Sequence, residues 1–299
     1  MWTKFASRRK RLDLITRFKF KLKRRELEKF YVSFVLPILE YGDVLWGGSY
    51  QQDLDKLDRV HIRAMRVITG ATERSSTLNL FHDLGWRTLD QRRIIHRLRW
   101  FYKIMNNKAP DFLVDLVPPT TGDRQNYSLR SSENITPYRC NRQYFSKSYF
   151  PTAINEWNAL PIHIRQSSSL SSYNYLLNKH FPAPPRKSWY GQGDRFLDIH
   201  HSRLRIGCSK LKGHLHYNLH VEDDPFCNCG QVVEYPHHYF FICPFYREQR
   251  RTLMDEVNLI VTNPSVDTLL YGDESLSHDK NIQIIMAVQY FIQKTKRFV

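Results

Sequence analysis

One short stretch of the chain holds the residues that constrain its fold most strongly: three cysteines and two histidines. Cys227 and Cys229 are followed by His237 and His238 and then by Cys243, all within seventeen positions. Zinc prefers four tetrahedral sulfur and nitrogen ligands, and a complete set of four protein ligands makes a structural site rather than a catalytic one. The spacing therefore predicts a structural zinc site formed by the three cysteines and one of the two histidines.

The cysteine content also indicates the redox compartment. The five cysteines are odd in number, and three of them crowd into one stretch, which suits metal binding better than a disulfide framework. No apolar run of secretory length follows the basic residues 8–11. The longest uncharged apolar run, residues 30–39, is about half of a membrane span and contains Pro37. We expect an intracellular protein without a membrane-spanning helix.

The charge of the chain limits the class of its partners. A net charge of +16 at pH 7 attracts polyanions, above all phosphate backbones. The first 25 residues carry eleven Lys and Arg against one acid, Asp13, with the apolar spacing of an amphipathic helix. An anionic membrane is the rival partner, but aromatic residues are interleaved with the basic ones along the chain. The pattern favours RNA or DNA, rather than a membrane, as the partner.

Two segments have the hydrophobic period of amphipathic helices with a basic face. Residues 54–68 and residues 89–105 each place apolar side chains on one face and cations on the other, and Gly70 ends the first segment. A solvated helix face is the alternative interpretation of each basic stripe, and their recurrence favours a phosphate-binding surface. The predicted nucleic-acid-binding residues are Arg59, Arg63 and Arg66 on the first helix and Arg92, Arg99 and Lys103 on the second.

The domain boundary is predicted from proline content. Three prolines in four positions, at residues 182–185, favour an extended linker over a continuing helix. We predict a helical region over residues 1–181, a linker over 182–202 and a smaller module over 203–299. The expected fold class is mostly α, with a small α+β module around the zinc site and a C-terminal helix over residues 281–294.

No complete catalytic site is evident in the sequence. Residues 222–224 are three consecutive acids, but Pro225 follows at once, so we predict a loop rather than a two-metal site. The sequence contains no glycine-rich phosphate loop and no nucleophile elbow. A second metal site, formed by Cys208 with His214, His216 and His220, is a further hypothesis. An alternative function is a host-retained zinc-binding adaptor whose aromatic residues bind protein.

The order of several segments resembles one protein family. The segments FYVSFVLPILEYGDVLWGG (30–48), LDRVHIRAMRVITGAT (57–72) and LGWRTLDQRR (84–93) are similar to the region after the palm in reverse transcriptases of non-LTR, LINE-type retrotransposons. The similarity continues through SYFPTAINEWNALP (148–161), RLRIGCSKL (203–211), the CNCG and HHYFFICP pieces and the ending KRF. It covers nearly the whole chain, and the ordered set is more specific than any one motif.

This resemblance implies a function and a set of site residues. The family's helical thumb grips a template-primer duplex, and its C-terminal knuckle engages nucleic acid. Carried over by position, the resemblance makes Cys227, Cys229, His238 and Cys243 the zinc ligands. It implies that the fingers and palm, with the catalytic aspartates that bind Mg²⁺, precede Met1, and that a longer form supplies them to a ribonucleoprotein of the nucleus and cytoplasm. Cys208 stands where the family commonly has histidine.

Overall fold

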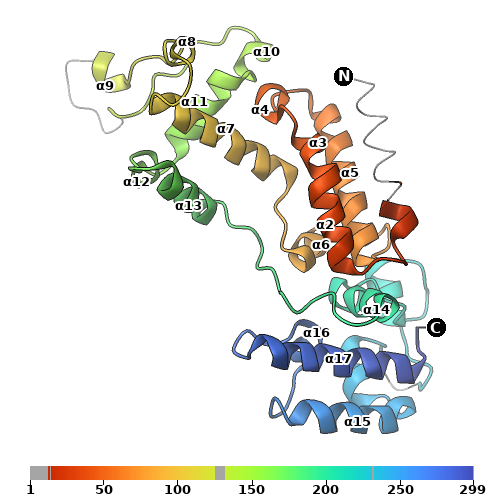
Figure 1. Cartoon of the computed structure of the whole chain (residues 1–299). Coiled ribbons are helices and arrows are strands. Elements are labelled where there is room, and N and C mark those ends of the chain that lie inside the picture. The colour runs from red at the N-terminus through yellow and green to blue at the C-terminus, as the bar shows by residue number, and fades with distance from the viewer. Residues whose placement is uncertain (1–12, 14, 125–131, 231, 299) are drawn as a thin grey trace. The chain divides into compact units, whose positions relative to one another are not determined.

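The computed structural model describes residue 13 and residues 15–124, 132–230 and 232–298 (Figure 1). This part of the chain is mostly helical, which confirms the expected fold class at that level. Its β structure is limited to two isolated bridges, Thr120 with Ile135 and Phe226 with Val233. The small module around the cysteines therefore contains much less strand than the predicted α+β fold. The basic helix expected in the first 25 residues falls mostly on residues 1–12, which lie outside the described residues.

The chain forms two compact units, and each combines segments that are distant in sequence. Unit 1 contains the described residues of Met1–Pro37, Val60–Trp86 and Pro184–Val299, and unit 2 contains those of Ile38–Arg59 and Arg87–Ala183. This division differs from the consecutive segments 1–181, 182–202 and 203–299. The physical reason is long-range packing of the N-terminal helices onto the C-terminal part of the chain, which no local pattern reveals.

Each helix lies entirely within unit 1 or unit 2, except α3 (Leu36–Glu40) and α5 (Gln51–Thr69), which begin in one unit and end in the other. Unit 1 contains α2 (Arg24–Phe30), η1 (Tyr31–Val35), α6 (Thr77–Leu84), α14 (Arg195–Ile206), η2 (His214–Asn218), η3 (His238–Ile242), η4 (Pro244–Tyr246), α15 (Arg247–Asn258), α16 (Val266–Tyr271) and α17 (His278–Thr295). Unit 2 contains α4 (Asp43–Trp46), α7 (Leu89–Met105), α8 (Asp111–Val114), α9 (Thr121–Arg124), α10 (Gln143–Ser146), α11 (Tyr149–Ala159), α12 (Ile162–Arg165) and α13 (Leu170–His180).

Local capping explains where the predicted helices begin and end. Thr88 and Gln91 form a capping box at the start of α7, whose bounds match the predicted 89–105. Gly70 follows α5 with φ +74°, as expected for a helix stop. Ser277 caps α17, which therefore begins three residues before the predicted helix. Asp194 caps α14, so residues 195–202 of the predicted linker are helical and only residues before them form a non-helical connection.

The core of unit 2 is formed by α7, α11 and α13, the gold and green helices of Figure 1. Tyr102 and Tyr173 stack with their ring centroids 4.1 Å apart, and Trp157 packs beside both. The two tyrosine hydroxyls donate to backbone carbonyl oxygens, so their polar ends are satisfied within the core. Trp157, from the aromatic stretch 144–157, is thus a core residue, whereas Tyr144 of the same stretch is 70% exposed.

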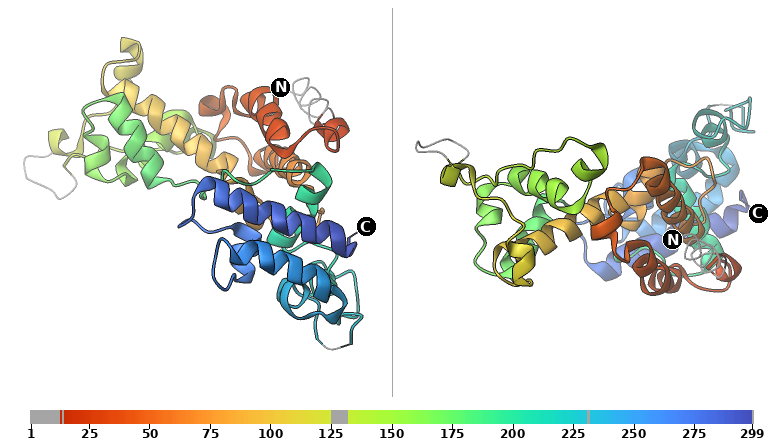
Figure 2. Two further views of the ribbon diagram at one scale, coloured as in Figure 1. Left: turned by 60° about the horizontal axis from the view of Figure 1, so that its bottom comes forward. Right: turned by 90° about the horizontal axis from the view of Figure 1, so that it is seen from above.

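The C-terminal core of unit 1 packs α17 against α15, α14 and α16. α15 and α17, both blue, run side by side in Figure 1 and Figure 2. Phe291 of α17 contacts Tyr239 and Phe240 of η3, with ring centroids 5.1 Å and 5.6 Å away. The turn that carries two of the predicted metal ligands is therefore anchored on a long helix by buried aromatic side chains.

Buried ion pairs between charged side chains stabilise a second part of unit 1. Asp83 of α6 accepts from Arg24 of α2 at 2.7 Å and from Arg205 of α14 at 2.7 Å, and all three residues are buried. Arg205 also lies over the ring of Tyr190, 4.0 Å from its centroid. This buried ion cluster, Arg24 with Asp83 and Arg205, joins three helices from distant parts of the sequence.

Candidate metal centre and basic residues

The first two cysteines lie on a tight turn between the bridged residues Phe226 and Val233. The amide of Cys227 donates to the carbonyl oxygen of Val232 at 3.0 Å, and the amide of Gly230 donates to that of Cys227 at 2.8 Å. Gly230 has φ +76°, a left-handed conformation that favours glycine. These contacts turn the backbone sharply after the second cysteine, so that both thiols face one small volume.

The other two ligands lie at the ends of the π-helical turn η3. His238 is its first residue, and Cys243 is its C-cap, whose amide donates to the carbonyl oxygen of His238 at 2.8 Å. His238 is 2% exposed, while His237 is exposed and lies 5.6 Å from the ring of Phe241. This turn places His238, rather than His237, beside the cysteines.

The four residues Cys227, Cys229, His238 and Cys243, here called the Cys-His cluster, can hold a metal ion. Their candidate ligand atoms all lie within 4.8 Å of one another. The Sγ atoms of Cys227 and Cys243 are 3.8 Å apart, and Cys229 Sγ is 3.3 Å from His238 Nε2. Two thiolates at the usual Zn–S distance of about 2.3 Å around a tetrahedral ion are about 3.8 Å apart. The arrangement has the size of a tetrahedral site and is too wide for a disulfide.

Burial shifts the pKa values of side chains in the Cys-His cluster. Burial raises the pKa of the Cys227 thiol to about 12. Burial also lowers the pKa of His238, so its imidazole is neutral at pH 7, as a ligand requires. Thiols with raised pKa values bind metal only as they release protons, and the metal's own charge offsets the cost of the buried thiolates.

Two groups outside the cluster hold its backbone. Arg250 of α15 donates from Nε to the carbonyl oxygen of Phe240 at 2.8 Å and from Nη2 to that of Cys243. Glu234, which is 2% exposed, accepts from Arg297 Nε at 2.7 Å and from the amide of Lys212 at 2.8 Å. Sequence reasoning missed both groups, because nothing in the spacing of the cysteines points to them.

We expect Arg250→Ala to weaken metal binding by the Cys-His cluster by about 10- to 100-fold, the usual cost of losing a group that orients metal ligands. The arginine fixes the carbonyl groups of the turn that carries His238 and Cys243, and its positive charge lies near the thiolates. Competition for zinc with a chromophoric chelator measures the effect. Arg251→Ala, at an exposed position of the same helix, is the matched control. Equal affinity in the two variants would contradict this role.

A second metal site at Cys208 is not formed by the part of the chain that the structure describes, where the Cys-His cluster is the one group of this kind. Cys208 is buried, and its backbone amide donates to the carbonyl oxygen of Arg203 at 2.9 Å. His214 Nδ1 is paired with the hydroxyl of Ser209 at 2.8 Å, and His216 Nδ1 lies 2.9 Å from the carbonyl oxygen of Glu222.

The acidic residues 222–224 lie in a loop, as predicted. Asp224 pairs with Lys212 at 2.8 Å and is exposed, so it does not form part of a paired-carboxylate metal site among the described residues.

His61, on the apolar side of α5, is buried, and its Nδ1 lies 2.5 Å from the hydroxyl of Tyr31.

The basic residues predicted on α5 differ in their exposure. The apolar face of this helix is buried as expected, with Leu57 and Ile68 at 3% and 0% exposed. Arg59 and Arg63 are exposed one turn apart, and Arg63 lies 3.7 Å from Asp13, a weak exposed pair. Arg66 is half-buried. α5 thus presents two cations, Arg59 and Arg63, to solvent.

On α7 the predicted stripe is divided between paired and unpaired cations. Arg92 pairs with Glu40, and His96 Nδ1 lies 2.7 Å from Asp43 Oδ2. Within the described residues, no carboxylate pairs with Arg99 or Lys103. On the opposite, apolar face Leu98 and Phe101 are buried. Met105 lies on the same face but is 37% exposed, because it is in the last turn of the helix.

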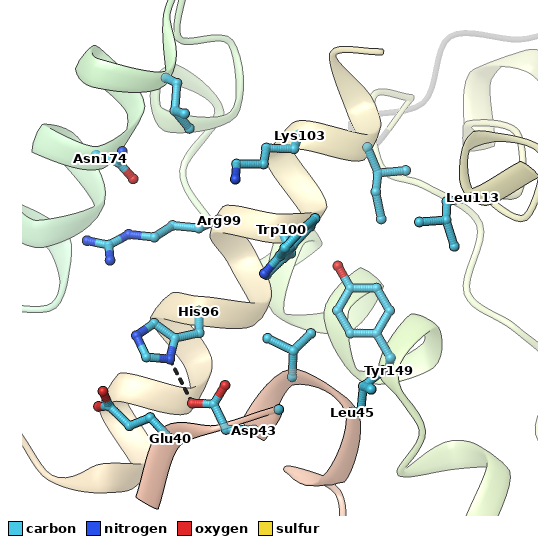
Figure 3. Close-up of a pocket in the computed structure, with 14 residues that line it drawn as sticks. Glu40, Asp43, Leu45, His96, Arg99, Trp100, Lys103, Leu113, Tyr149 and Asn174 are labelled. Carbon is cyan, nitrogen blue, oxygen red and sulfur yellow. Dashed lines mark hydrogen bonds and ion pairs between the residues drawn. The ribbon is translucent and has the colours of Figure 1, made fainter. Parts of the chain in front are cut away.

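The unpaired cations of α7 line a cavity of about 680 Å³ within unit 2, here called the α7 pocket. Figure 3 shows Arg99 and Lys103 on the side of Asn174, and Trp100 between Lys103 and Tyr149. The sequence prediction placed the two cations on a basic face but did not predict a cavity, because its other walls come from residues 40–45 and from residues after position 110.

No known protein family, curated protein or solved structure matches this chain. Among the described helices, none is both long enough and apolar enough to cross a membrane.

Proposed function

We propose that this chain binds RNA or DNA through the basic residues of α5 and α7, and that its Cys-His cluster holds one structural Zn²⁺ ion. The observation that carries the proposal is the charge surplus of the sequence. The chain has 45 Lys and Arg against 29 Asp and Glu, which leaves a surplus of 16 positive charges (45 − 29). A polyanion supplies the missing partners.

The resemblance of the ordered segments supports a more specific form of the proposal. In this form the chain is the C-terminal part of a non-LTR retrotransposon RNA-directed DNA polymerase, with a helical thumb and connection region and a zinc knuckle that hold template-primer or target DNA. Synthesis would depend on Mg²⁺ held by a palm that a longer form supplies. Such a chain would work in a ribonucleoprotein of the nucleus and cytoplasm.

Zinc is the metal that suits the cluster best. Three sulfur ligands and one imidazole are soft or borderline ligands, which favour Zn²⁺ over Mg²⁺ or Ca²⁺. Four protein ligands leave no position for water, so the ion would shape the module and would not act on substrate. Its role in nucleic-acid binding would be to fix the backbone around η3.

Charge removal on α5 tests the binding surface. We expect Arg59→Gln with Arg63→Gln to make the slope of log K against log salt shallower by about two for RNA or DNA, since each lost phosphate contact removes about one. Fluorescence anisotropy with a labelled oligonucleotide measures the slope. Lys108→Gln with Lys179→Gln removes two exposed charges elsewhere and is the matched control.

Two outcomes would contradict the proposal. Equal slopes for both double variants would show that α5 makes no particular contact. Binding of a protein partner that survives nuclease treatment, together with no oligonucleotide binding, would instead support the zinc-binding adaptor.

A further inference from the structure

The α7 pocket has a polar side and an apolar side. Arg99, Lys103 and Asn174 line one part of it, and Trp100, Leu113 and Tyr149 line another, as Figure 3 shows. Its volume of about 680 Å³ lies within the range of small-molecule sites, roughly 300–1,000 Å³. A ligand that fills both parts must combine a charged or polar group with an apolar, planar or aliphatic body.

The polar side has groups without partners. Arg99 Nε and Asn174 Oδ1 are buried side-chain atoms with no hydrogen-bond partner among the described residues. A buried donor and a buried acceptor left in this state each cost free energy, which a ligand with both kinds of group would recover. Arg99 reaches Asn178 Oδ1 only at 3.5 Å, so most of its donors stay available.

The charges of Arg99 and Lys103 favour an anion on their side of the pocket. Glu40 and Asp43 also line the pocket, where Glu40 pairs with Arg92 and Asp43 Oδ2 lies 2.7 Å from His96 Nδ1. Burial and then repulsion from Arg92 lower the pKa of Arg99. Burial, followed by repulsion from Arg92 and Arg99, lowers that of Arg87. An anion beside Arg99 and Lys103 would relieve this repulsion among the cations.

The apolar side offers an aromatic surface. Trp100 is 46% exposed although it lines the pocket, and Lys103 Nζ lies 4.6 Å from its ring centroid. The ring and the ammonium group are therefore neighbours, so that one ligand can stack on the ring while its anionic group meets the cation. Nucleobases stack on aromatic side chains, and their edges have donors and acceptors that match an amide such as Asn174.

We infer that the α7 pocket holds a nucleotide unit, with its phosphate between Arg99 and Lys103 and its base against Trp100. The inference rests on the proposed nucleic-acid binding and specifies one contact within it. An unpaired nucleotide of a single strand and a free mononucleotide share this chemistry. The pocket would give the chain a preference for strands that have bases over strands with the phosphate backbone alone.

The test compares hexanucleotides with and without bases. The probes are a labelled single-stranded hexanucleotide, the abasic hexamer of equal charge, and adenosine monophosphate, each titrated with the full chain. We expect Trp100→Leu to weaken binding of the hexanucleotide about tenfold, as loss of one stacked base does, with little change for the abasic hexamer. Arg99→Gln with Lys103→Gln should weaken binding of both hexamers.

The controls are Tyr175→Leu, an exposed aromatic residue of α13, and Lys108→Gln, an exposed cation after α7. Circular dichroism establishes that each variant is folded. Adenosine monophosphate bound in a Trp100-dependent way, without such dependence for the strand, would support the pocket as a site for free nucleotide. If the wild type binds the strand but Trp100→Leu binds every probe equally well, the inference fails and the proposed function stands. If the wild type binds no probe, the inference fails, and binding of a duplex oligonucleotide then decides the proposed function.

Discussion

Replacement of Cys243 by serine is expected to abolish tight zinc binding and to disorder the turn that carries Cys227 and Cys229. Cys243 is fully buried, with its Sγ 3.8 Å from that of Cys227, and a serine hydroxyl does not supply a thiolate ligand. Structural zinc contributes about 10–16 kcal/mol to small zinc-finger peptides. Residues 220–224 beside this turn are exposed, so little apolar core replaces the metal.

Two measurements check this result. Native mass spectrometry gives the zinc content, which we expect to fall from one ion per chain to none. Hydrogen exchange reports the turn, where the amides of Cys227 and Gly230 are hydrogen-bonded and should lose protection. Cys140→Ser is the matched control, because Cys140 lies in unit 2, outside the Cys-His cluster. Retention of one zinc per chain by Cys243→Ser would show that the cluster is not the metal site.

The second large effect is expected at the buried ion cluster of unit 1. Asp83→Ala should destabilise the protein by about 3–5 kcal/mol, because it leaves Arg24 and Arg205 buried without their shared carboxylate. Chemical denaturation followed by circular dichroism measures the change. Asp255→Ala, at an exposed position of α15, should change stability by less than about 0.5 kcal/mol. Equal stabilities of the two variants would contradict the role of the buried ion cluster.

The same carboxylate gives stability a defined dependence on pH. Burial alone would raise the pKa of Asp83, but the charges of Arg205 and Arg24 outweigh it and hold that pKa below its usual value near 3.8. The contribution of Asp83 is therefore fully present above about pH 4 and is lost as the pH falls through the lower pKa of the folded state. Asp83→Ala should remove this component of the acid unfolding curve.

Features that depend on residues close together in the sequence were predicted well. The bounds of α7 follow from its hydrophobic period and the Thr88 capping box, both of which lie within one helix. The Cys-His cluster was predictable because its members lie within seventeen positions, although the choice of His238 over His237 required the turn η3. In each case the residues that determine the structure are neighbours in the chain.

Features that depend on distant residues were not predictable. Arg205 meets Asp83 across 122 positions, and Arg297 meets Glu234 across 63, so no periodic pattern links them. The cations of α7 were unpredictable for the same reason, because Arg92 forms an ion pair with Glu40, which is 52 positions away in the sequence. The sequence pattern thus predicts which cations share a helix face, and only the fold shows which of them pair with a carboxylate.

The salt dependence of nucleic-acid binding tests the proposed function most directly. The measurement is the affinity of the nuclease-treated, zinc-loaded chain for a labelled oligonucleotide at about 50 mM and 200 mM salt, a range over which six to ten phosphate contacts cost about 10³- to 10⁵-fold. A net charge of +16 predicts a steep loss of affinity within this range. Weak binding of equal strength at both salt concentrations would contradict the proposal.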